Sequence, residues 1–126
     1  MKNVLVVGGA GYIGSHTIQL LKKSGCNIFV VDDLSTGHLS AVPDIAAFYE
    51  MNVLDLPKLR MIFAKHQFDA IFHFAAKLSV PESVEKPYDY FDTNVVGTAN
   101  LLRMCFEFNV SRFIFSSSSA VYGVSE

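Results

Sequence analysis

Three glycines at fixed spacing constrain the fold of this chain more than any other feature. Gly8, Gly11 and Gly14 directly follow an apolar run at residues 3–7 and precede a helical pattern. Between a strand and a helix, such glycines allow a tight turn and let backbone N–H groups approach a pyrophosphate at the helix N-terminus. The spacing therefore predicts a strand–turn–helix unit that binds a dinucleotide. The alternative is a glycine-rich turn that binds no ligand.

The rest of the chain alternates short apolar runs with helical patterns. Strands are expected at residues 3–7, 27–31, 46–49, 70–74 and 112–115. Most of these runs are continuously apolar, which is typical of parallel strands covered by helices on both faces. The pattern predicts an α/β fold of the Rossmann type, a doubly wound parallel sheet with strand order 3-2-1-4-5.

Three helices are expected between these strands. The first covers residues 13–24 and ends at Gly25, the second begins after the cap Asp55, and the third covers residues 88–108 and stops at Asn109. The apolar positions of these patterns are Ile13, Thr17, Leu20 and Leu21 in the first, Leu56, Leu59, Ile62 and Phe63, facing inward, in the second, and Phe91, Val95, Ala99, Leu102 and Phe106 in the third. By the same period, Phe106, Phe108, Phe113 and Phe115 are expected in the core.

Composition narrows the class of protein. The 126 residues, 51% hydrophobic and 17% charged, suffice for one domain over residues 1–126 and argue against disorder. A net charge of −2 gives no basic surplus for a nucleic acid. The apolar stretch at residues 4–13 is too short to span a membrane and lacks a cleavage signal, so we expect a cytoplasmic protein with Cys26 and Cys105 reduced.

An acidic residue stands where a dinucleotide site needs one. Asp32 lies 18 residues beyond Gly14, at the end of the second expected strand, and Asp33 follows it. A carboxylate there accepts hydrogen bonds from an adenosine ribose and repels a 2′-phosphate, and no Lys or Arg lies between Lys23 and Lys58. The cofactor expected is therefore NAD rather than NADP. The alternative is an ordinary turn or cap residue.

Serines end the last expected strand, and histidines are scattered. Residues 116–119 are all serine and lie where ligands bind in such sheets, although a polar strand end is the simpler interpretation. The four histidines have no metal-ligand spacing with the two cysteines, so no metal site is expected.

Five segments together carry a resemblance to a known family. GGAGYIGSH, VVDDLSTG, HFAAKLSVPESVEKP, NVVGTANLL and FIFSSSSAVYG make the chain similar, from end to end, to the extended short-chain dehydrogenase/reductases. Within that family it looks like the N-terminal part of a nucleotide-sugar 4-epimerase whose substrate domain is absent. The resemblance implies NAD-dependent interconversion of UDP-glucose and UDP-galactose through a 4-keto sugar, in a protein that is a homodimer through the long helix after Pro87.

The resemblance also implies roles for individual residues. Ser118 would hydrogen-bond the hexose 4-hydroxyl. The residues that would contact the cofactor are Gly8, Gly11, Tyr12, Ile13, Gly14, Asp32, Asp33, Leu34, Ser35, Thr36, Gly37, Asn52, Val53, Phe74, Ala75, Ala76, Asn94 and Ser116. The residues at 79–83 would lie near the substrate phosphates.

Three departures limit this transfer. Asn52 replaces the usual Asp, and Leu78 replaces a Lys that Lys77 would substitute for. The family's acid–base pair is Tyr-x-x-x-Lys, and no tyrosine of this chain has Lys at +4. Residues 1–126 alone are therefore expected to be inactive, since Ser118 cannot remove a proton by itself.

Ser119 and Ala120 replace the acidic pair of related dehydratases, which disfavours that activity. The competing interpretations are another nucleotide-sugar or hydroxysteroid-type oxidoreductase, or a non-catalytic NAD-binding module.

Overall fold

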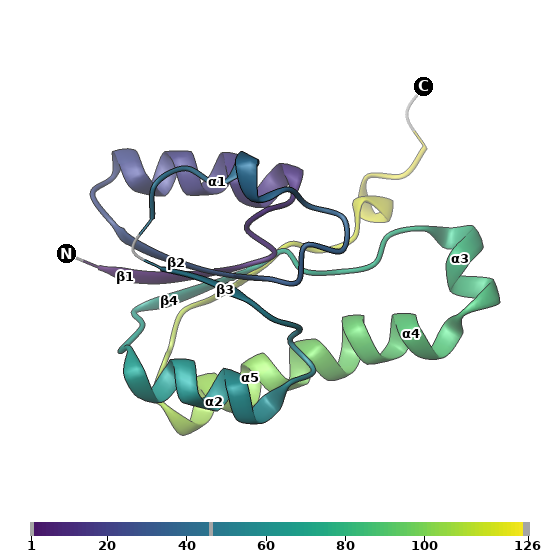
Figure 1. Cartoon of the computed structure of the whole chain (residues 1–126). Helices are drawn as coiled ribbons and strands as arrows, with labels where there is room; N and C mark the ends of the chain where they lie inside the picture. The colour runs from purple at the N-terminus through teal and green to yellow at the C-terminus, as the bar shows by residue number, and fades with distance from the viewer. Residues whose placement is uncertain (1, 46, 125–126) are drawn as a thin grey trace.

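Five parallel strands form one sheet in the order β3-β2-β1-β4-β5 (Figure 1). The computed structural model describes residues 2–45 and 47–124. The strands are β1 Asn3–Val7, β2 Asn27–Asp32, β3 Ala47–Glu50, β4 Ala70–His73 and β5 Phe113–Phe115. The predicted fold class and strand order are confirmed, and each described strand end lies within one residue of its expected position. Residue 46, the expected start of the third strand, lies outside the described residues.

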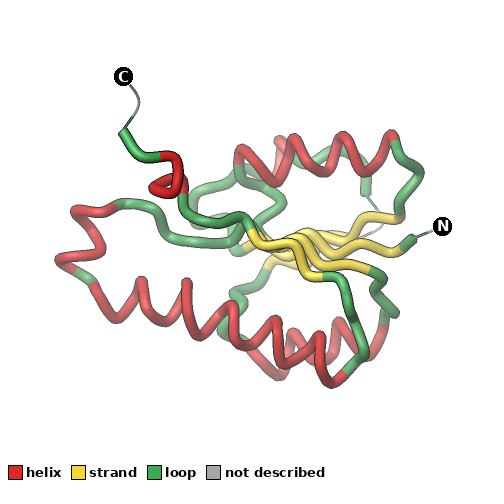
Figure 2. Tube along the Cα trace, turned by 180° about the vertical axis from the view of Figure 1, so that it is seen from behind, coloured by secondary structure: helices red, strands yellow, loops and turns green. Residues whose placement is uncertain are grey.

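Helices cover both faces of this sheet (Figures 1 and 2). Helix α1 (Tyr12–Lys23) lies on one face, and α2 (Leu56–Lys65) and α5 (Gly97–Glu107) lie on the other. Successive β1 side chains point to opposite faces, so Val4 and Val6 pack toward Ile18 of α1, whereas Leu5 and Val7 join the core under α2 and α5. Burial on both faces explains the continuous apolar runs.

The apolar residues that set the period of α1 do not all lie on the face of the helix that packs against the sheet. Ile13 and Leu20 are exposed, whereas Ile18 is buried and Leu21, one of the predicted apolar positions, packs against the same core cluster. The reason is Gly14, which is buried and packs directly against the Gly8 carbonyl oxygen, so the positions aligned with Gly14 point inward.

In α2 the predicted inner face is confirmed, because Leu59, Ile62 and Phe63 are buried and Leu56 packs against them. The predicted cap is confirmed as well, since the Asp55 carboxylate accepts a hydrogen bond from the Lys58 amide at 3.2 Å.

The third predicted helix is more complex than its pattern indicates. It runs as α4 (Pro87–Phe91), a π-helical turn η2 (Asp92–Val96) and α5, and it ends before Asn109, whose φ is 57°. A separate short helix, α3 (Val80–Glu85), precedes it, is capped by the Ser79 hydroxyl and is not among the three helices expected from the sequence. In Figure 1, α3 and α4 project beyond the carboxyl ends of the strands.

The apolar stripe of this helix faces outward, contrary to the core expected at Phe106. Its members Phe91, Val95, Ala99, Leu102 and Phe106 are all exposed, Phe106 by 87%. The buried positions of α5 are Gly97, Leu101, Met104 and Cys105. Gly97 sits against the Val53 side chain, which a Cβ would approach to 2.6 Å, and this contact turns the glycine side of the helix inward. Phe115 is also exposed, whereas Phe108 and Phe113 pack against the core.

Two further predictions concern the thiols and the membrane. Cys26 and Cys105 are both free, as expected, and burial raises the pKa of the Cys105 thiol to about 11. Within the described residues, the helices are too short or too polar to cross a membrane.

Candidate functional site

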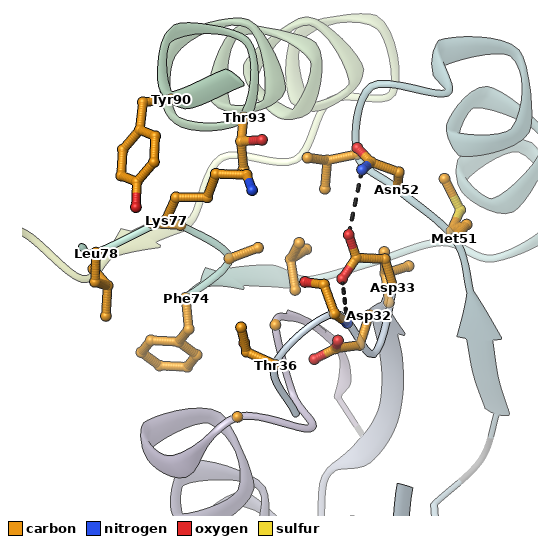
Figure 3. Close-up of a pocket in the computed structure, with 18 of the residues that line it drawn as sticks. Asp32, Asp33, Thr36, Met51, Asn52, Phe74, Lys77, Leu78, Tyr90 and Thr93 are labelled. Atoms are coloured by element: carbon orange, nitrogen blue, oxygen red, sulfur yellow. Dashed lines mark hydrogen bonds between the residues drawn. The ribbon is translucent and has the colours of Figure 1, made fainter. Parts of the chain in front are cut away.

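A cavity of about 640 Å³ opens at the carboxyl ends of the central strands (Figure 3). Val7 is in register with both Val31 and His73, so the loops that follow β1, β2 and β4 begin at the same edge of the sheet. The cavity is lined by Val7, Gly8, Gly11, Val31, Asp32, Asp33, Ser35, Thr36, Met51, Asn52, Val53, Phe74, Ala75, Ala76, Lys77, Leu78, Ser79, Glu82, Tyr90 and Thr93.

The glycine loop forms the floor of this pocket. Gly8 has φ of +81°, and a Cβ there would lie 2.6 Å from the Ala75 amide nitrogen. Only glycine combines that left-handed backbone with so close an approach to another chain segment. The loop then leads into α1, whose first turn presents N–H groups without intrahelical acceptors. The floor is thus a backbone surface suited to an anionic group.

Two adjacent carboxylates form one side wall. Asp32 accepts hydrogen bonds from the Ala10 and Leu34 amides, each at 2.8 Å, and so ties the loop after β2 to the glycine loop. Asp33 accepts from the Ser35 amide at 2.9 Å and from Asn52 Nδ2 at 3.3 Å. Both carboxylates retain lone pairs for further donors. The wall therefore accepts hydroxyl donors and disfavours a phosphate.

The opposite wall carries different chemistry (Figure 3). Among the described residues that line the cavity, Lys77 is the one cationic side chain, and its Nζ lies 5.8 Å from the centre of the Tyr90 ring. Tyr90 Oη accepts from the Ser79 amide at 3.0 Å and donates to Glu82 Oε2 at 3.3 Å. Helix α4 is thereby joined to the loop after β4 and to α3.

The structure brings most of the predicted site residues together. Those that line the cavity are Gly8, Gly11, Asp32, Asp33, Ser35, Thr36, Asn52, Val53, Phe74, Ala75 and Ala76. Outside its lining, as the described residues define it, lie Tyr12, Ile13, Gly14, Leu34, Gly37, Asn94, Ser116 and Ser118.

The residues outside the lining have identifiable places. Gly37 packs on the Ala10 backbone, and Asn94 hydrogen-bonds the backbone of Lys77 rather than facing the cavity. The Ser116 amide donates to the His73 carbonyl at 3.2 Å, at the end of β5. The exposed Ser118 accepts from the Ala120 amide at 3.1 Å and caps the short helix η3 (Ser119–Tyr122).

Sequence reasoning missed several lining residues, namely Val7, Val31, Met51, Tyr90 and Thr93, whereas Ser79 and Glu82 belong to the segment expected near the substrate phosphates. Tyr90 and Thr93 reach the cavity because α4 lies beyond the strand ends, a placement that follows from the turn between α3 and α4. The predicted helix from residue 88 contains both residues, but its period does not indicate which face meets the pocket.

Comparison with known proteins agrees with this geometry. Residues 4–126 match the model of the NAD dependent epimerase/dehydratase family. The chain belongs to that family. Among its relatives are UDP-glucose 4-epimerases: the Lactobacillus helveticus enzyme is 47% identical over 121 residues, 96% of this chain and 37% of the relative.

Solved structures of the family superpose well on the fold. The Brucella ovis UDP-glucose 4-epimerase in complex with NAD has a TM-score of 0.90 and 48% identity, covering 100% of this chain and 38% of that one. The Thermotoga maritima UDP-glucose 4-epimerase with UDP-glucose has a TM-score of 0.91 and 39% identity, covering 98% and 40%. The chain thus spans less than half the length of the relatives it matches.

Proposed function

We propose that this chain is the NAD-binding portion of a UDP-glucose 4-epimerase. The observation that carries the proposal is the meeting of the Gly8 loop and the paired carboxylates Asp32 and Asp33 in one cavity at the strand ends. A glycine-rich turn without a ligand would not require the approach of Gly8 to Ala75, and an ordinary cap would not require both acids to line a cavity. The close relatives narrow the class from dinucleotide binding to the epimerase.

The residues of the cavity fit an extended dinucleotide. The adenosine ribose would lie at Asp32 and Asp33, next to Asn52, and the pyrophosphate would lie over the glycine loop. The nicotinamide end would run along residues 74–76 below Lys77. The distribution of charge supports NAD over NADP, since both acids are on the adenosine side and Lys77 is on the other wall.

The chemistry of the reaction divides between the cofactor and the protein. Bound NAD would serve as acceptor for the hydride that leaves C4 of the sugar and as donor when that hydride returns to the opposite face, so the redox balance would close within one turnover. The proton of the 4-hydroxyl must pass to a base, for which the family uses Tyr-x-x-x-Lys. Ser118 would orient that hydroxyl, and no such pair exists in these 126 residues.

Titration calorimetry with NAD and NADP tests the binding proposal. We expect NAD to bind at least about tenfold more tightly than NADP, and equal affinities would contradict the assignment of the two acids. The 126-residue chain should show no conversion of UDP-galactose to UDP-glucose. A longer protein carrying this sequence followed by a Tyr-x-x-x-Lys helix should show it, and failure there would leave another sugar-nucleotide oxidoreductase as the alternative.

We further propose that the exposed stripe of α4, η2 and α5 contacts a second copy of the protein. Its members Phe91, Val95, Ala99, Leu102 and Phe106 recur at helical spacing on one outer face. A contiguous apolar stripe of this kind is typical of a protein interface.

We place the protein in the cytoplasm, where the free thiols Cys26 and Cys105 stay reduced.

A further inference from the structure

A chain of hydrogen bonds behind the pocket links the core to the wall at residues 74–79. This segment has no regular secondary structure, and all six of its residues line the cavity. Its centre is held by Asn94, whose Oδ1 accepts from the Lys77 amide at 2.9 Å and whose Nδ2 donates to the Lys77 carbonyl at 3.1 Å. The position of Asn94 therefore determines where this wall lies.

Asn94 is itself fixed from the core side. It lies in the π-helical turn η2, and its carbonyl accepts a hydrogen bond from the Thr98 hydroxyl at 2.7 Å. Thr98 Oγ1 lies 2.8 Å from Nε2 of His73, the last residue of β4. Because the single Thr98 hydrogen is given to Asn94, the imidazole must be the donor, and the proton of a neutral His73 lies on Nε2.

The surroundings of His73 are unusual for a residue that only fills space. It is 1% exposed, and its Nδ1 is the buried side-chain atom that lacks a hydrogen-bond partner in the described part of the chain. The rings of Phe113 and Phe115 lie 6.0 and 5.7 Å away. Burial lowers the pKa of His73 to about 4, so the imidazole is neutral near pH 7. An apolar side chain would avoid the unsatisfied nitrogen but would leave Thr98 without its donor.

We propose that His73 and Thr98 are positioning residues for the ligand pocket, which act through Asn94 to hold the Lys77 backbone and the wall at residues 74–79. This inference rests on the proposed function, since that wall is the one assigned to the nicotinamide end of NAD. Neither residue lines the cavity, so their effect on binding is indirect. Within the described residues, Asp32 and Asp33 on the adenosine side make no hydrogen bond to this chain of contacts, so binding there should not depend on it.

The test compares two ligands in Thr98 variants. Thr98→Val keeps the shape of the side chain and removes the hydroxyl, Thr98→Ser keeps the hydroxyl, and Thr17→Val is the matched control. Thr17 makes the same bond to a carbonyl four residues earlier, at 2.9 Å, but on α1 and outside the pocket. Dissociation constants are measured for NAD and for adenosine monophosphate, which reaches only the Asp32 side.

We expect Thr98→Val to weaken NAD about tenfold and adenosine monophosphate less than about twofold. Thr98→Ser and Thr17→Val should bind both ligands as the unmodified chain does. Equal weakening of both ligands, unchanged NAD affinity, or a Thr98→Ser variant as weak as Thr98→Val would each overturn the proposal. If Thr98→Val does not fold, Thr98→Ala removes the same hydroxyl while favouring the helix, and the same criteria apply to it.

A second readout needs no ligand. Hydrogen exchange of the Lys77 amide should be slow in the unmodified chain and at least about tenfold faster in Thr98→Val, because its acceptor Asn94 is released. Nitrogen-15 shifts of His73 should show the proton on Nε2 at pH 7. If NAD does not bind the unmodified chain, the proposed function fails, and these two measurements still decide whether the positioning contacts exist. Unchanged exchange at Lys77 would refute them.

Discussion

Gly8 and Gly25 offer a direct test of how the glycine loop is held. Both have left-handed backbone, with φ of +81° and +80°. They differ in the space around them. A Cβ on Gly8 would lie 2.6 Å from the Ala75 nitrogen and 2.8 Å from the Phe74 carbonyl carbon, whereas one on Gly25 would have no atom of the described residues within 4 Å beyond its chain neighbours. Alanine at either position incurs the same conformational penalty, and only at Gly8 does it also collide with backbone.

The expected magnitudes follow from these two terms. The left-handed backbone costs a non-glycine residue about 1–2 kcal/mol, so Gly25→Ala should lower the free energy of unfolding by about that amount. Overpacking against atoms that cannot rotate away adds about 1–3 kcal/mol, so Gly8→Ala should lower it by about 2–5 kcal/mol. Urea denaturation followed by circular dichroism measures both values.

Binding adds a second difference between the two variants. Gly8→Ala displaces the wall at Ala75 and should weaken NAD, whereas Gly25→Ala, at the far end of α1, should leave NAD affinity unchanged. Equal losses of stability in the two variants would refute the reasoning, because they would show that the approach of the loop to residues 74–75 has no energetic consequence.

Three further predictions follow from the structure. The pKa of His73 is about 4 in the folded chain and near 6.5 in the unfolded chain, so the unfolded chain binds more protons between these values. The free energy of unfolding should therefore fall by about 3 kcal/mol as pH drops from 6.5 to 4. Denaturation measured over this pH range should show a smaller fall in His73→Gln. Asp32→Ala leaves two loop amides without a charged acceptor and should lower stability by about 2 kcal/mol and weaken NAD, as chemical denaturation and calorimetry would show. Phe106→Glu should shift the protein to monomer in sedimentation experiments, whereas Leu20→Glu, exposed on α1 on the opposite face of the sheet, should not; a dimer that survives Phe106→Glu would exclude the stripe.

The sheet and the glycine loop were predictable because their signals are local. A parallel strand buried on both faces reads as a continuous apolar run, and the spacing of Gly8, Gly11 and Gly14 has one familiar structural context. The inner faces of α1 and α5 were not predictable from hydropathy, because Gly14 and Gly97 mark them. A glycine adds little to a hydropathy pattern, yet it allows two chain segments to approach most closely. The buried side of these two helices is therefore set by the residue that contributes least to the pattern.

The candidate site divides in the same way. Asp32 and the glycines follow strands directly and therefore reach the cavity by topology alone. Tyr90 and Thr93 reach it through a change of chain direction between two short helices, and Asn94 turned out to hold the backbone of the wall instead of lining it. Such roles depend on tertiary geometry that no spacing in the sequence specifies.

The π-helical turn gives a single helix two rotational phases. Each α-helical residue advances by about 100°, so one additional residue in a turn rotates everything beyond it by roughly that angle. Before the turn, Tyr90 lines the pocket. After the turn, Leu101 and Met104 are buried in the core. Winding Asp92–Val96 as uniform α-helix would rotate one of these two sets by roughly 100° away from its partner, whereas deleting one residue there would restore a uniform helix with both sets in place. The π-helical turn therefore allows one continuous helix to line the ligand pocket with its first part and to pack in the core with its last part.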